Sequence, residues 1–369
     1  MNTTLSKENI LSMTSENMQS IVQKALSFQR ISKDEALFLY KNADVGLLGA
    51  VADVINREKN QDLVVFNRNI HIEPTNICIY NCKFCSFSAN HGRPSWIMSD
   101  DEICQLIEKI KDEVTEVHIV GGVYKEKSIY DYANLLKQIK VIAPNIHLKA
   151  FTAVELDYMS SKEDLTTAEG LNFLRQSGLD SIPGGGAEIF EPSVREQICG
   201  NKSTAKTWLS IHKTAHQLNI PSNATMLYGH VEQLEHRIDH LDQLRTLQDE
   251  TQGFQAFIPL KFKNQHNQLD NIEETNIIDD FKTFAISRIY LDNIKNIKAY
   301  WPMLGKSISQ LLLSFGVNDL DGTINDSTKI YSMAGAKEKN PAMSVEEISK
   351  LIIQANKIPK ERDSLYNFI

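Results

Sequence analysis

The chain has 369 residues, and 39 Lys and Arg against 47 Asp and Glu give it a formal net charge of −8. Apolar residues at 42% and charged residues at 23% exclude collagen-like, low-complexity and wholly disordered chains. The acidic balance argues against a nucleic-acid partner, and no apolar run reaches the ~18 residues of a membrane span. The first twenty residues lack the apolar core or Arg-rich pattern of an export or transit signal. We therefore expect a cytoplasmic protein with no nucleic-acid or membrane partner.

The N-terminal region, residues 1–65, is predicted to be a helical extension. Within it, residues 32–60 contain apolar residues spaced three and four apart, which indicates two short helices. Ser32 is the expected cap of the first helix, with Asp34 and Glu35 in its first turn.

Short apolar runs then alternate with amphipathic helices, which is typical of a parallel sheet wrapped by helices. The predicted strands cover residues 71–76, 116–122, 146–152, 179–185, 223–230, 254–260, 296–301 and 316–322. Ser99 and Glu102 form a capping box, and Pro192 and Gly200 bound a helix over residues 191–199.

Six to eight such units without a Gly-, Ser- or Pro-rich linker imply one α/β fold, a TIM-like (β/α) barrel over residues 66–325. An open doubly wound sheet would need a G-x-G-x-x-G turn after its first strand, which this sequence lacks. Residues 326–369 are expected to form a C-terminal helical segment that packs on the barrel.

Three of the five cysteines, Cys78, Cys82 and Cys85, form a C-x3-C-x2-C loop directly after the first predicted strand. A barrel places its chemistry at this end of its strands. Three thiolates can hold three irons of a [4Fe-4S] cluster and leave the fourth iron open to a ligand. The competing interpretation is a structural zinc site with His91 as fourth ligand, although such sites usually present paired C-x2-C units. Cys104 and Cys199 are expected in helices away from this loop.

The cysteine loop, with the aromatic Phe84 before its last cysteine, resembles that of the radical S-adenosylmethionine (SAM) superfamily. The resemblance implies that the open iron binds the methionine part of SAM and that an electron from the cluster yields a 5′-deoxyadenosyl radical. It also implies SAM contacts from two later motifs, a Gly-Gly pair at the end of the second predicted strand and a G-x-I-x-G-x-x-E-like motif on the fifth. The matching residues here are Gly121, Gly122, Thr225, Gly229 and Glu232. Val123 replaces the usual third acidic residue of the first motif, and Thr225 replaces the first glycine of the second.

Over residues 30–369 the chain further resembles the futalosine-pathway enzymes of menaquinone biosynthesis, through phrases such as NICIYNCKFCSF, PGGGAEIF, NATMLYGHVE and LQDETQGFQAFIPL. The synthase branch of that family fits better than its sister, dehypoxanthine futalosine cyclase. The resemblance implies that the adenosyl radical adds to 3-[(1-carboxyvinyl)oxy]benzoate, an aromatic dicarboxylate enol ether, to give 6-amino-6-deoxyfutalosine. SAM would then be a consumed co-substrate, and an electron donor such as flavodoxin or ferredoxin is expected. The alternative from another class is a non-catalytic zinc-binding protein.

Four further features are candidates for contacts to SAM or substrate. Glu188 is a candidate partner for a ribose hydroxyl of SAM. Gly184–Gly186 offer either backbone N–H groups at a helix N-terminus or a turn with positive φ. His230 could donate a proton or bind a carboxylate, or be a packed core histidine. Arg288 could bind a substrate carboxylate bidentately, or pair with Asp292 four residues on.

Overall fold

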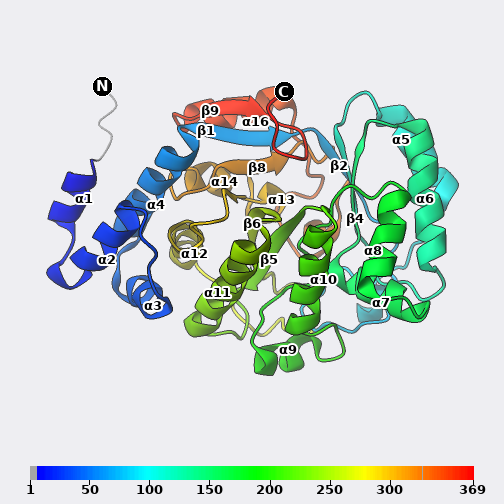
Figure 1. Ribbon diagram of the computed structural model, residues 1–369, viewed down its shortest axis with the longest axis horizontal. Helices are drawn as coiled ribbons and strands as arrows, with labels where there is room; N and C mark the ends of the chain where they lie inside the picture. Colours follow the sequence, from blue (N-terminus) through cyan, green and yellow to red (C-terminus); the bar gives the residue numbers. More distant parts are fainter. Residues whose placement is uncertain (1–5, 326) are drawn as a thin grey trace.

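The computed structural model describes residues 6–325 and 327–369, and its strands lie at the centre with helices around them (Figure 1). The strands are β1 (Leu63–Asn67), β2 (Asn69–Ile72), β3 (Glu116–Ile119), β4 (His147–Ala150), β5 (Ser222–Tyr228), β6 (Phe254–Lys261), β7 (Asn296–Ile297), β8 (Asp319–Gly322) and β9 (Ile358–Glu361). They pair in three parallel groups, β2-β3-β4, β5-β6-β7 and β8-β1-β9. The predicted (β/α) barrel is confirmed.

The three groups are joined by isolated β-bridges and by β1 and β2, which follow each other almost without a break. Ser181 pairs with Lys149 of β4, and Ile182 pairs with Ser222 of β5, so residues 181–182 take the place of a strand. A bridge from Lys298 to Asp319 joins β7 to β8. Only Arg68 separates β1, which pairs with β8, from β2, which pairs with β3, and this closes the circle.

Two of the sequence expectations differ from this sheet. The expected strand over residues 179–185 forms only the two bridges just described. The C-terminal segment is not wholly helical, because β9 follows its last helix and pairs with β1. Residues 1–5 and 326, which fall in the predicted extension and at the predicted start of the C-terminal segment, lie outside the described residues. The three domain limits stay predictions.

The helices surround the barrel, and the first four of them gather at one end of the molecule (Figure 1). They are α1 (Lys7–Met13), α2 (Glu16–Leu26), α3 (Lys33–Asn42), α4 (Val45–Asn60), α5 (Asp100–Ile110), α6 (Ile129–Ile142), α7 (Ala153–Lys162), α8 (Thr167–Gln176), α9 (Pro192–Cys199), α10 (Ala205–Gln217), α11 (Leu234–Thr251), α12 (Ile277–Tyr290), α13 (Trp301–Leu304), α14 (Lys306–Leu312), α15 (Ile330–Met333) and α16 (Val345–Gln354), with a 3-10 turn at Ala89–His91. The predicted cap at Ser32 and the predicted capping box at Ser99 are both present, and Ser32 also forms a capping box with Glu35. Within the described ranges, none of these helices has the length and apolar character needed to cross a lipid bilayer.

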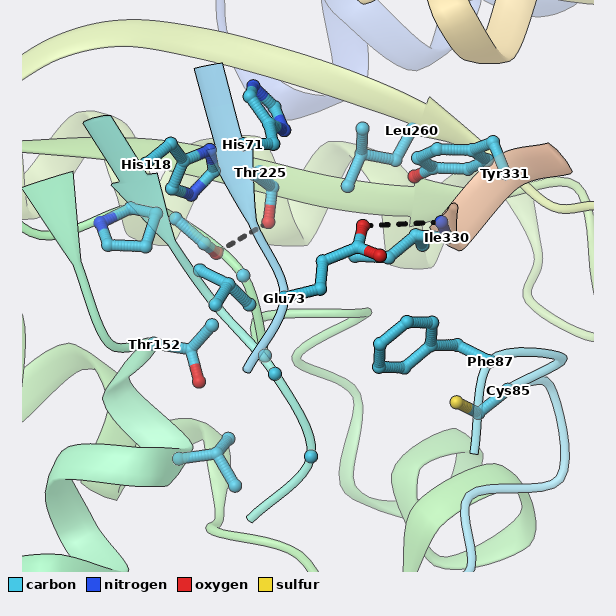
Figure 2. A pocket seen from close by; sticks show the side chains of 18 of the residues that line it. His71, Glu73, Cys85, Phe87, His118, Thr152, Thr225, Leu260, Ile330 and Tyr331 are labelled. Atoms are coloured by element: carbon cyan, nitrogen blue, oxygen red, sulfur yellow. Dashed lines mark hydrogen bonds between the residues drawn. The ribbon is translucent and has the colours of Figure 1, made fainter. Parts of the chain in front are cut away.

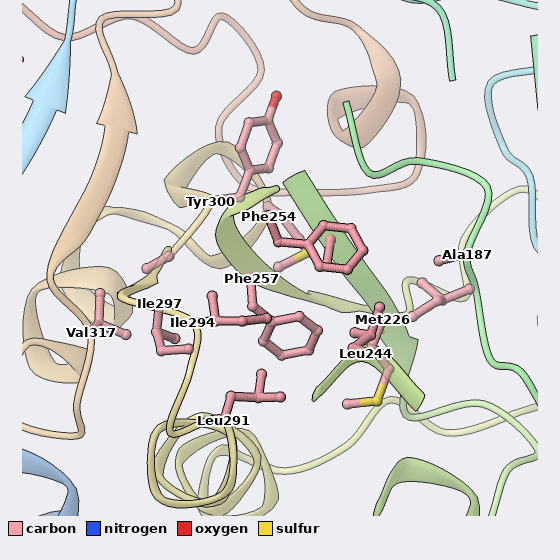
Figure 3. Packing of buried hydrophobic residues seen from close by; sticks show 14 of the residues in the cluster. Ala187, Met226, Leu244, Phe254, Phe257, Leu291, Ile294, Ile297, Tyr300 and Val317 are labelled. Atoms are coloured by element: carbon pink, nitrogen blue, oxygen red, sulfur yellow. The ribbon is translucent and has the colours of Figure 1, made fainter. Parts of the chain in front are cut away.

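The apolar core lies between the outer face of the sheet and the helices. Successive side chains of a strand point to opposite faces, so Met226 of β5 and Phe257 of β6 point outward and pack with Leu244 and Leu291 (Figure 3). These side chains are almost fully buried, and each contributes roughly 1.5–3 kcal/mol to folding. Asn223 and Thr225, which alternate with Met226 on β5, line the interior cavity instead. The helical shell therefore stabilises the fold, and the barrel interior is left for polar chemistry.

Candidate active site

A cavity of about 300 Å³ opens inside the barrel at the carboxyl ends of its strands (Figure 2). Its wall includes Cys78, Cys82 and Cys85, and the Gly121–Gly122 and Gly184–Gly186 turns also line it. The cysteine loop and both glycine motifs, which are far apart in sequence, therefore meet at one site large enough for small molecules.

Backbone hydrogen bonds hold the cysteine loop against the end of β3. The Gly122 N–H donates to the Thr75 carbonyl at 2.8 Å, and the Ile79 N–H donates to the Val123 carbonyl at 3.0 Å. The Val123 N–H donates to Cys78 Sγ at 3.3 Å. A backbone N–H of this kind can orient a cysteine sulfur that binds a metal.

The structure does not gather the four ligands of the zinc interpretation. Residues 6–325 and 327–369 contain no group of three or more His, Cys, Asp or Glu gathered closely enough for one metal ion. A cluster binds each thiolate through a different iron, so its ligands stand farther apart than the ligands of one zinc. His91, the fourth ligand of the zinc interpretation, instead places Nε2 3.2 Å from the Cys82 carbonyl oxygen.

Burial raises the pKa of Cys82 to about 12, and it also raises the pKa of Cys85. Without metal, these two groups are therefore neutral thiols at pH 7. Iron would have to displace their protons, as metals do at cysteine ligands generally.

The glycine pair after β3 is needed for close packing on the cysteine loop. A Cβ atom on Gly122 would lie 2.2 Å from the Ile77 carbonyl oxygen, and one on Gly121 would lie 2.8 Å from the Thr75 carbonyl oxygen. The Gly121 N–H also donates to Glu155 at 3.4 Å. Both glycines line the cavity, where their backbone can meet a ligand.

Glu188 lines the cavity beside the cysteine loop and forms a buried ion pair with Lys202. Lys202 Nζ also lies 5.5 Å from the ring centroid of Phe84, which lines the same wall. Glu188 itself has a positive φ of 48°. The expected helix N-terminus at Gly184–Gly186 is wrong, because the next helix, α9, begins only at Pro192. Gly186 adopts a φ of 88°, so the turn interpretation holds there.

The motif on β5 divides between cavity and scaffold. Thr225 lines the cavity, and its hydroxyl donates to the Gly184 carbonyl at 2.6 Å. Glu232 accepts from the N–H groups of Gly229 (2.6 Å) and His230 (2.8 Å) and pairs with Arg237 at 2.7 Å. Burial alone would raise the pKa of Glu232, but His230 and Arg237 outweigh it and the pKa is lowered. Gly229 and Glu232 do not line the cavity, so they shape the turn after β5.

Two candidate substrate-binding residues lie away from the cavity. His230 is buried, with Nε2 3.1 Å from the Leu227 carbonyl oxygen and Nδ1 3.1 Å from Glu232. Arg288 is fully buried and donates to the carbonyls of Gly316 (2.7 Å) and Lys295 (2.9 Å) and to Asn318 (2.7 Å). Arg288 therefore does not bind a substrate carboxylate. Its alternative pairing is also wrong, because Asp292 pairs with Arg30 at 2.9 Å.

Cys199 lies closer to the cysteine loop than expected. The Lys83 N–H donates to the Ile198 carbonyl at 2.9 Å, which ties the loop to the last turn of α9. Cys199 and Cys82 line a shared surface depression there.

Sequence reasoning missed Glu73, which follows β2 and fastens a distant segment over the cavity. Its carboxylate accepts from the Thr328 hydroxyl at 2.8 Å and from the N–H groups of Lys329 (3.0 Å) and Ile330 (3.3 Å; Figure 2). Ile330 and Tyr331 both line the cavity. The available signal was a carboxylate within the first predicted strand, directly before Pro74.

Comparison with known proteins agrees with this site. The model of the radical SAM superfamily matches residues 72–244, and that of the CofH/MqnC C-terminal region matches residues 251–369. An aminodeoxyfutalosine synthase of Thermus thermophilus is 40% identical and covers 94% of both chains. A 5-amino-6-(D-ribitylamino)uracil–L-tyrosine 4-hydroxyphenyl transferase of Methanocaldococcus jannaschii is 38% identical, covering 92% of this chain and 98% of that one. The crystal structure of methylornithine synthase (PylB) shares the fold, with a TM-score of 0.74 at 13% identity over 92% of this chain and 97% of that one.

The chain therefore belongs to the radical SAM superfamily, in the group that carries the CofH/MqnC C-terminal region. It is an enzyme of that superfamily, whose members use a [4Fe-4S] cluster and SAM.

Proposed function

We propose that this enzyme is an aminodeoxyfutalosine synthase. It would join the adenosyl group of SAM to 3-[(1-carboxyvinyl)oxy]benzoate. Methionine would be released, and one carboxylate of the substrate would leave as carbon dioxide or bicarbonate. The observation that carries the proposal is the 40% identity to the Thermus thermophilus synthase along 94% of each chain. The cavity supports it, because the three cysteines and polar residues of the barrel interior line the same cavity.

In this proposal Cys78, Cys82 and Cys85 hold the [4Fe-4S] cluster. When bound, the cluster supplies the single electron that cleaves the sulfonium of SAM. Gly121 and Gly122 present backbone to the methionine end, and Phe84 closes the same wall. The task of the chain is then to hold SAM and substrate in contact and to exclude water.

The remaining motif residues would position the adenosyl end. Glu188, which pairs with Lys202 at the cavity wall, would accept a hydrogen bond from a ribose hydroxyl. Thr225 lines the wall for adenine, and Glu232 fixes the turn at Gly229 beyond it. His230 belongs to this turn and has a positioning role. The enzyme would work in the cytoplasm with an electron donor such as flavodoxin or ferredoxin.

The test is anaerobic reconstitution with iron and sulfide, followed by incubation with SAM, a reductant and the enol ether. We expect 6-amino-6-deoxyfutalosine and methionine in equal amounts, measured by mass spectrometry. Cys82→Ala should abolish the product, whereas Cys104→Ala, outside the cysteine loop, should retain it. Stoichiometric free 5′-deoxyadenosine would exclude the synthase and favour the hydrogen abstraction of a dehypoxanthine futalosine cyclase.

The second candidate is the uracil–tyrosine transferase activity, because a relative so named is 38% identical over 92% of this chain. Incubation with L-tyrosine and 5-amino-6-(D-ribitylamino)uracil separates the two. A coupled product from this pair, without any from the enol ether, would replace the proposed function.

A further inference from the structure

A layer of polar side chains forms the inner floor of the cavity. His71, His118 and Lys149 are direct neighbours in the registers of β2, β3 and β4, so all three point to the same, inner face. Asn223 of β5 and Lys298 after β7 line the same cavity. We call these five residues the basal layer. In Figure 2 its two imidazoles lie on the other side of the cavity from Cys85.

Such a layer is not what stability alone would select. The interior of a barrel of this type is usually packed by branched apolar side chains. Here Lys149 pairs with Glu116 at 2.7 Å, and Lys298 pairs with Asp321 at 2.6 Å, with all four residues buried. Burial alone would raise the pKa of Glu116, but Lys149 and its other cationic neighbours outweigh it and hold the pKa well below its ordinary value. Buried ion pairs of this kind are weak stabilisers, which favours a functional reason for them.

Parts of the basal layer have no partner in the free protein. Asn223 is 4% exposed, and its Oδ1 has no hydrogen-bond partner among the described residues. His71 Nε2 and His118 Nε2 also make no hydrogen bond within that part of the chain, and His71 Nε2 lies 3.8 Å from the Asp321 carboxylate. Burial lowers the pKa of both imidazoles, that of His71 to about 4, so each ring is neutral at pH 7. An unsatisfied buried polar group costs about 1–3 kcal/mol, and several around one cavity indicate a ligand that supplies the missing contacts.

The groups that remain available to a ligand are mainly donors. Lysine ammonium, an imidazole N–H and the Nδ2 group of Asn223 donate, whereas Asn223 Oδ1 accepts and the carboxylates of Glu116 and Asp321 are occupied by the two lysines. Above this layer, Ile258 and Leu260 of β6 give the cavity an apolar wall. Donors beneath an apolar wall match an aromatic ring that carries a carboxylate.

We propose that the basal layer binds the ring carboxylate of the substrate, with His118 and Asn223 as the residues that select for it. This inference rests on the proposed function for the identity of the substrate. The ring carboxylate at the floor would direct the enol ether across the cavity, toward the cysteine loop and the bound SAM. A substrate without that carboxylate would leave the floor groups unsatisfied.

The test measures binding to the anaerobically reconstituted enzyme with SAM and no reductant, so that no turnover occurs. The probes for calorimetry are 3-[(1-carboxyvinyl)oxy]benzoate and 2-phenoxyacrylate, which lacks the ring carboxylate. We expect wild type to bind the dicarboxylate at least roughly tenfold more tightly. In His118→Phe and in Asn223→Leu this preference should fall severalfold, while thermal stability stays equal or rises because an unsatisfied polar group has been removed.

The matched control is Ser309→Ala, which removes an unpartnered buried hydroxyl from α14, outside the cavity. It should leave the preference unchanged. If His118→Phe or Asn223→Leu fails to fold, the affinities of wild type for the two probes still test the inference. Equal affinity for both probes would overturn it. An unchanged preference in both folded variants would overturn it as well.

The two proposals fail differently. If the dicarboxylate binds with the expected preference and reduction gives no aminodeoxyfutalosine, the proposed function fails and the carboxylate site stands. If product forms while the variants keep the wild-type preference, the carboxylate site fails alone.

Discussion

Replacing Gly122 by alanine should dislodge the cysteine loop from the end of β3. The added Cβ would lie 2.2 Å from the Ile77 carbonyl oxygen and 2.7 Å from its carbonyl carbon. Real Cβ atoms essentially never come within 3.0 Å of such atoms, so the two backbones must separate by about 0.8 Å. Neither contact is with a flexible side chain that could rotate away.

The displacement would act directly on the cysteines proposed to hold the cluster, because Ile77 immediately precedes Cys78. It would also stretch the 3.3 Å contact from the Val123 N–H to Cys78 Sγ. Overpacking of this kind typically lowers the free energy of unfolding by ~1–3 kcal/mol. A misplacement approaching 1 Å at a positioned group can reduce the rate by on the order of 100-fold. We therefore expect a folded variant with less bound iron and a rate of SAM cleavage lower by about that factor.

The assay is anaerobic reconstitution followed by iron and sulfide analysis and by release of methionine from SAM. Gly121→Ala, with its closest contact at 2.8 Å, should show a smaller loss of the same kind. Gly46→Ala is the matched control, because its Cβ would meet only the cap side chain of Asp44, at 3.1 Å. Wild-type iron content and rate in Gly122→Ala, or an equal loss in Gly46→Ala, would refute the reasoning.

Three further variants test other contacts. Lys202→Met leaves Glu188 buried without its cation and should lower the free energy of unfolding by ~3–5 kcal/mol, measured by denaturant titration. Adding Glu188→Gln should restore most of this stability. An equal loss in the double variant would contradict the pairing. Arg288→Lys should lower the free energy of unfolding by ~2–5 kcal/mol and leave the KM for the enol ether unchanged, because the partners of Arg288 are backbone carbonyls and Asn318. A raised KM at wild-type stability would instead indicate that Arg288 binds substrate. Burial raises the pKa of Glu73 to about 7, so the folded protein keeps a proton that the unfolded chain releases from about pH 4.5 upward, and stability falls as pH rises toward 7. Relative to Glu73→Gln, wild type should lose up to ~3 kcal/mol of unfolding free energy between pH 5 and pH 8, and parallel pH curves would count against this.

The barrel could be predicted from sequence because most of its strands are short apolar runs with helices between them. β9 could not be predicted, because its sequence IPKE contains Pro359 and has no fully buried face. Its position is decided by its pairing with β1, a distant segment. Residues 181–182 form a strand position through single bridges on each side, which no local pattern encodes. What sequence could not supply was thus the closure of the sheet, which depends on registers between distant segments.

The candidate site divides in the same way. The cysteine loop could be predicted because its three thiols are contiguous in sequence. His71, His118 and Lys149 come from three strands and meet only through the register of β2, β3 and β4. A signal was present, since each interrupts an apolar strand at an alternate position. In a barrel whose outer face is covered by helices, such a residue must point into the interior.

Charge pairing was the least predictable property, because the nearest charge in sequence is seldom the nearest in space. Asp292 lies four residues from Arg288, yet its partner is Arg30, from the N-terminal helices. Arg288 is completely buried, and it donates to backbone carbonyls and to Asn318 rather than to Asp292. Lys202 is the opposite case, because its local sequence gives no sign of a role at the site. The fold nevertheless places it in contact with Glu188 and near Phe84, beside the cysteine loop. The cations of this barrel therefore differ in where their partners lie: Lys149 and Lys298 pair with carboxylates that line the cavity, whereas Arg288 is held by groups outside it. This difference is the reason why we propose the basal layer, rather than Arg288, as the carboxylate site.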